Sequence, residues 1–143
     1  MNFPRIILAA LGAFVAYFAV GFVVFALTAA PMKREFEKYP AVYRPQESMK
    51  GFMPIGMAAM LVAILVLAVL YAMTYRGVSG PLQGAHFGGH FGGLIGIFVV
   101  CAFVVHNWMM LNIGSRLTLY QAVSYFVQWL VVGAAIGLIY RPR

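Results

Sequence analysis

The chain has 143 residues, of which 64% are hydrophobic and 9% are charged, and it carries a formal net charge of +7. A soluble domain has roughly 25% charged residues, and a chain this short has too high a surface-to-volume ratio to hide so much apolar surface in its own core. Composition therefore excludes a water-soluble globular domain. The basic residues stand between long apolar runs, which favours lipid headgroups or topology signals over nucleic acid as the reason for the charge.

Four apolar runs are long enough to cross the hydrocarbon layer, which is roughly 30 Å thick and takes about 20 helical residues. The predicted spans cover residues 6–30, 52–75, 84–106 and 117–140. Strands are excluded because open sheet edges are not satisfied in lipid, and the runs lack the alternation of a barrel. We therefore expect an all-α fold over 1–143, an integral membrane four-helix bundle with antiparallel, up-down spans. The first run is too long for the apolar region of a signal peptide, so we take it as a retained span.

One connection, residues 31–51, is longer than the others and holds eight of the thirteen charged residues. Met32, Phe36 and Tyr39 recur in it at helical spacing with charges between them. This pattern predicts a short interfacial helix, which two downstream prolines end.

Glycine gives the strongest local signal. The third span carries one row at a spacing of four, Gly84, Gly88, Gly92 and Gly96, and a second, adjacent row, Gly89 and Gly93. A glycine inside a helix costs about 1 kcal/mol relative to alanine, so six of them make sense where another backbone comes close. We expect both rows to pack against a helix of this chain or of a neighbour. A flat cofactor on the glycine face is the alternative.

All three histidines lie on the same span. His86 and His90 are one turn apart near its start, whereas His106 follows sixteen residues later, about 24 Å along the helix. A zinc or iron site usually takes a third ligand, and no other span holds a histidine or an acid, so we expect no metal site within one chain. A single axial histidine is easier to satisfy, and Ala102 one turn before His106 resembles the small-xxx-His pattern of light-harvesting helices. His86, His90 and His106 are therefore candidate ligands of a haem or chlorophyll-type pigment.

Two further stripes lie on the second and fourth spans. Gln121, Ser124 and Gln128 share one face of the fourth, where an unpaired amide costs several kcal/mol, so this face is expected to point inward and form interhelical hydrogen bonds. A polar permeation path is the alternative, but no intramembrane charge accompanies it.

The second span begins with a methionine stripe, Met49, Met53, Met57 and Met60. It resembles that of small copper-uptake channels, but it stands at the wrong end of its span and the chain has an extra helix. Methionine also fills irregular gaps between helices, and we expect this role here.

The layout resembles small four-span bacterial membrane proteins classed as domains of unknown function. The shared features are an Ala/Gly/Val-rich first span, a charged loop with aromatic and proline breaks, a glycine-rich third span and the sequence Gly-Ala-Ala-Ile-Gly-Leu over 133–138. The resemblance implies a multi-pass location in a bacterial inner membrane and brings no activity with it.

No nucleophile–base pair is visible, so we expect no catalysis. Helix-contact signals are abundant, which predicts an accessory or structural subunit of a larger membrane complex, such as an energy-transducing one, or a homo-oligomer. Its expected partners are the lipid bilayer and other membrane subunits or further copies of itself, with no nucleic acid. The alternatives are a subunit that binds haem or (bacterio)chlorophyll through histidine, and a small transporter or channel.

Overall fold

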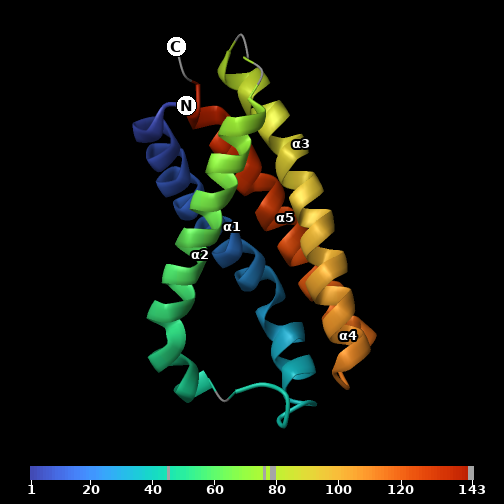
Figure 1. Cartoon of the computed structure of the whole chain (residues 1–143). Coiled ribbons are helices and arrows are strands. Elements are labelled where there is room, and N and C mark those ends of the chain that lie inside the picture. The colour runs from blue at the N-terminus through green and yellow to red at the C-terminus, as the bar shows by residue number, and fades with distance from the viewer. Residues whose placement is uncertain (45, 76, 78–79, 142–143) are drawn as a thin grey trace.

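The protein is a bundle of four long helical segments that alternate in direction (Figure 1). The computed structural model describes residues 1–44, 46–75, 77 and 80–141, with only the backbone of Gln46. Within this part, four segments are long and apolar enough to cross a membrane, as the sequence predicted. They are α1 (Phe3–Phe36), α2 (Gln46–Thr74), a third segment made of α3 (Pro81–Val99), η1 (Val100–Val105) and α4 (His106–Met110), and α5 (Ser115–Ile139).

The first helix is longer than its predicted span. Asn2 caps it by accepting a hydrogen bond from the backbone N–H of Arg5 at 3.3 Å, and a proline occupies its first turn. The helix then continues through Pro31 to Phe36, so the charged segment that was expected as a separate interfacial helix extends α1 instead. Pro31 removes one backbone donor, a loss that helices in membranes tolerate.

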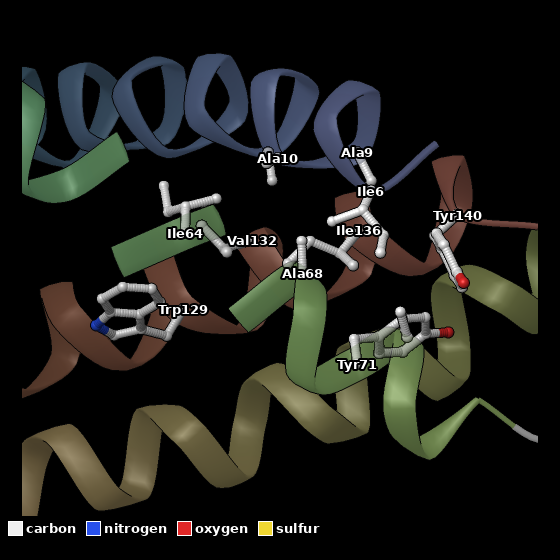
Figure 2. Packing of buried hydrophobic residues seen from close by; sticks show 12 residues of the cluster. Ile6, Ala9, Ala10, Ile64, Ala68, Tyr71, Trp129, Val132, Ile136 and Tyr140 are labelled. Carbon is white, nitrogen blue, oxygen red and sulfur yellow. The ribbon is translucent and has the colours of Figure 1, made fainter. Parts of the chain in front are cut away.

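The core lies where α1, α2 and α5 meet near the two termini. It consists mainly of alanines on α1, of alanines together with larger residues on α2, and of larger residues on α5 and at Tyr140 (Figure 2). The buried residues of this cluster are Ile6, Ala9, Ala10, Ala13, Ile64, Ala68, Tyr71, Ala72, Trp129, Val132, Ile136 and Tyr140. Alanines on α1 let its backbone approach the neighbouring helices, and the aromatic rings fill the wider space at the end of the bundle.

The loop after α1 folds back onto the turn that precedes α5. A Cβ atom on Gly114 would come within 2.5 Å of the Tyr39 hydroxyl, so the tyrosine lies directly against the glycine. Beside it, Glu35 is buried and pairs with Lys38 at 2.7 Å between carboxylate and ammonium. The Tyr39–Gly114 contact thus joins the first loop to the turn before α5 at this end of the bundle.

In contrast, α2 diverges from α1 toward this loop (Figure 1). Its second half is packed, with Ile64, Ala68 and Tyr71 fully buried. Every residue from 47 to 59 is exposed. The Arg44 guanidinium, from the loop before α2, lies 4.1 Å from the centroid of the Phe52 ring, but no other helix of the described chain buries the first half of α2.

Candidate functional site

The contact between α3 and α5 is built from glycine on both helices. Gly84, Gly88, Gly92 and Gly96 are all buried. Cβ atoms on Gly88 and Gly92 would collide with the carbonyl oxygens of Gly133 and Trp129 on α5. The glycine row of α3 therefore packs against another helix of the same chain, α5, and the two backbones are in direct contact.

The glycines of α5 that complete this contact did not enter the predicted site. Gly133 and Gly137 are buried, and a Cβ atom on Gly137 would collide with the carbonyl oxygen of Gly84. The signal was present in the sequence, because these two glycines have the same spacing of four as the row they face.

The second glycine row is differently placed. Gly89 and Gly93 are only half-buried, and an added Cβ on Gly93 would meet nothing within 4 Å. At Gly89 the nearest such atom is the Ala134 Cβ, at 3.9 Å. This row leaves open space on α3 instead of holding a second helix against it.

His86 and His90 are brought together on the exposed side of α3. Their Nε2 atoms are 3.2 Å apart, and the two rings stand almost perpendicular, with an interplanar angle of 84°. Within the described residues, no group of three or more His, Cys, Asp or Glu side chains comes close enough to surround a metal ion. The pair is thus a two-ligand arrangement that faces away from the bundle.

His106 lies far along the same segment and is also exposed. Between it and His90 the helix widens into the π-helical turns of η1, which the sequence did not predict. Such turns shift the register of every following side chain. The structure does not bring His106 near the other two histidines, and a haem or pigment on any of the three stays a prediction.

The polar face of α5 points toward α1 and the first loop. A Cβ atom on Gly21 would come within 2.9 Å of Gln128 Nε2, so the amide packs against the glycine of α1. Gln121 donates a hydrogen bond to the Tyr43 hydroxyl at 3.4 Å, and Ser124 is half-buried on the same face. The amides thus lie in helix and loop contacts.

The methionine stripe of α2 runs from the exposed first half of the helix to Met60, which is half-buried and packs against the core. Met53, Met57 and Met60 precede Ile64 and Ala68 at spacings of three or four residues, so they continue the buried face of α2. Met53 is 60% exposed and Met57 is 41% exposed. The face of α2 that is buried in the second half of the helix is thus exposed in the first half.

An open pocket of about 740 Å³ lies at the end of the bundle that holds the termini. It is lined by Met1, Asn2, Phe3, Pro4, Ala72, Tyr75 and Tyr140. None of the predicted site residues lines it.

Comparison of the chain with family models, curated proteins and solved structures gives no match.

Proposed function

We propose that this protein is a non-catalytic membrane subunit that binds a partner helix along the uncovered half of α2. The proposal rests on one observation, the continuation of the α2 core face into a segment that no other helix of the described chain buries. Ile64 is fully buried on this face, whereas Met57, two turns earlier, is 41% exposed. A helix that lay against Met53 and Met57 would extend the same packing.

The side chains of this segment suit a helix–helix contact. Methionine is flexible and polarisable, and it is common on surfaces that adapt to different partners. Gly51 and Gly56 have nothing within 4 Å of an added Cβ, so a second backbone has room to approach there. Close approach matters in lipid, because apolar surface alone gives little drive for helices to associate and packing supplies the free energy.

Site-specific photo-crosslinking in native membranes tests the proposal. A benzoylphenylalanine in place of Met53 or Met57 should give a protein adduct, and its mass separates a second copy of this chain from a different subunit. Leu94 on α3 serves as the matched control, since it is 68% exposed on a helix whose buried glycine face packs against α5 of the same chain. Adducts at both α2 positions but not at Leu94 would support the proposal. Lipid adducts alone at Met53 and Met57 would refute it.

The pigment alternative predicts a different observation. A haem or chlorophyll held by His86, His90 or His106 would give the protein purified from its native membrane a strong Soret or red absorption band. The proposed role needs no chromophore, so we expect only the ultraviolet absorption of Phe, Tyr and Trp and no band at visible wavelengths. A band at visible wavelengths that is lost in a histidine variant would replace the proposal with the alternative.

A further inference from the structure

The distance between His86 and His90 carries an inference that is independent of the proposed function. Both imidazoles project from the exposed side of α3, and their Nε2 atoms lie 3.2 Å apart. Two nitrogens at this distance either share one proton in a hydrogen bond or direct both lone pairs toward a common ion. Spacing alone did not reveal which nitrogens would face each other, and the structure supplies that information.

The separation of the two Nε2 atoms is short enough for both nitrogens to bind a single transition-metal ion. Zinc binds imidazole nitrogen at roughly 2.0–2.1 Å. With the two nitrogens 3.2 Å apart, the angle at such an ion is about 100°, near the tetrahedral value. Both ligands come from one straight turn of α3, so small ring rotations complete the geometry and the backbone stays in place.

The position of the pair lets water and an ion reach it. The third segment runs over 30 residues, from Pro81 to Met110, which is about 45 Å of helix against a hydrocarbon layer of roughly 30 Å. If the excess is shared between the two ends, His86 stands at the boundary of the hydrocarbon and His90 one turn inside it. His86 therefore adjoins the hydrated headgroup region, and water from that region can occupy the remaining coordination positions on the outer side of the pair.

We propose that His86 and His90 together bind one divalent transition-metal ion of the zinc, copper or nickel class. Imidazole suits these ions, and two imidazoles one helical turn apart bind one ion from the same side. Water completes the coordination, so the proposal departs from the expectation of no metal site within one chain, which rested on the need for a third protein ligand. The second imidazole binds intramolecularly once the first has bound, so the pair holds the ion more tightly than either ring alone.

Calorimetric titration of tag-free, detergent-purified protein with Zn²⁺ tests the proposal, in a Cys101→Ser background that removes the exposed thiol. We expect one ion per chain and a loss of affinity of about tenfold or more in His86→Ala and in His90→Ala. His106→Ala is the matched control, because His106 is an exposed histidine of the same segment without a second imidazole one turn away. The Zn²⁺ affinity of this variant should stay within about twofold of that of the parent.

A relocated histidine separates chelation from simple histidine content. In the double variant His90→Ala/Leu94→His the chain keeps three histidines, but the partner ring of His86 moves to two turns away, about 12 Å along the helix. This variant should bind no better than His90→Ala. The proposal would be overturned if it bound like the parent, if His90→Ala kept the parental affinity, or if His106→Ala lost as much as the pair variants.

Discussion

A Cβ atom on Gly88 would collide with the carbonyl oxygen of Gly133, and a Cβ atom on Gly133 would collide with the carbonyl oxygen of Gly88. The contact between α3 and α5 is therefore reciprocal, with one backbone directly on the other. No side chain can yield at this point, so relief requires the two helices to move apart.

The first prediction concerns this contact. Gly88→Ala and Gly133→Ala should each lower the free energy of unfolding by about 1–3 kcal/mol, the usual cost of overpacking. Gly93→Ala is the control on the same helix, because its new Cβ meets nothing within 4 Å. That variant should lose no stability, since alanine is the better helix former. Unfolding in mixed detergent micelles measures all three, and equal stabilities for Gly88→Ala and Gly93→Ala would contradict the predicted contact.

The second prediction concerns the contact between the first loop and the turn before α5. A substitution of Tyr39 should offset the effect of a substitution of Gly114. An added Cβ on Gly114 would lie 2.5 Å from the Tyr39 hydroxyl but 3.6 Å from the Tyr39 Cζ. The hydroxyl is the far end of a side chain that can move aside, so Gly114→Ala should destabilise the parent by only about 1 kcal/mol, the low end of the cost of overpacking, and should cost less in a Tyr39→Phe background, where the oxygen is gone. The four proteins form a double-mutant cycle measured by thermal unfolding. Additive effects of the two substitutions would show that the loop does not pack on this turn.

The third prediction concerns the hydrogen bond between Gln121 and Tyr43. At 3.4 Å between nitrogen and oxygen it is long, so its coupling energy should fall near the average of about 0.6 kcal/mol for such bonds in membrane proteins. The cycle of Gln121→Leu with Tyr43→Phe measures this coupling. A parallel cycle of Gln121→Leu with Tyr75→Phe, at a tyrosine that lines the pocket at the opposite end of the bundle, should give none. If the control cycle gave an equally large coupling energy, the hydrogen bond between Gln121 and Tyr43 would not be its cause.

The fourth prediction separates the two halves of α2 in the isolated chain. Ile64 is fully buried, whereas Ile55 on the same helix is 67% exposed. Ile64→Ala should destabilise the bundle, though by less than the roughly 2–5 kcal/mol seen in soluble cores, because the unfolded helix exposes its isoleucine to lipid and only packing is lost. Ile55→Ala should have no measurable effect on the stability of the isolated chain. A large loss at Ile55 would show that α2 is packed along its whole length.

Much of the fold could be predicted from residue type and spacing. Apolar runs of bilayer length give the four spans, since few other structures satisfy their backbone in lipid. The inward orientation of Gln128 follows from the cost of an unpaired amide. The end of the first span could not be predicted in the same way, because Pro31 is compatible both with a helix end and with a helix that loses one hydrogen bond.

The parts that were not predicted depend on distances between segments. The glycine row could face a helix of this chain or of another, and only the register of Gly88 against Gly133 identifies α5. The divergence of α2 from α1 could not be predicted from the sequence, since a methionine such as Met57 is equally compatible with a core and with an interface. The facing Nε2 atoms of His86 and His90 depend on rotamers, which spacing does not fix.

The central claim, that four helical segments cross the bilayer, is tested most directly by thiol labelling of intact vesicles. In a Cys101→Ser background, single cysteines replace Asn2, Glu37, Gly80 and Asn112, and a membrane-impermeant maleimide is applied from one side. Four crossings predict that positions 2 and 80 label together and that positions 37 and 112 label together from the opposite side. Labelling of positions 2 and 37 from the same side, or of 80 and 112 from the same side, would contradict the account.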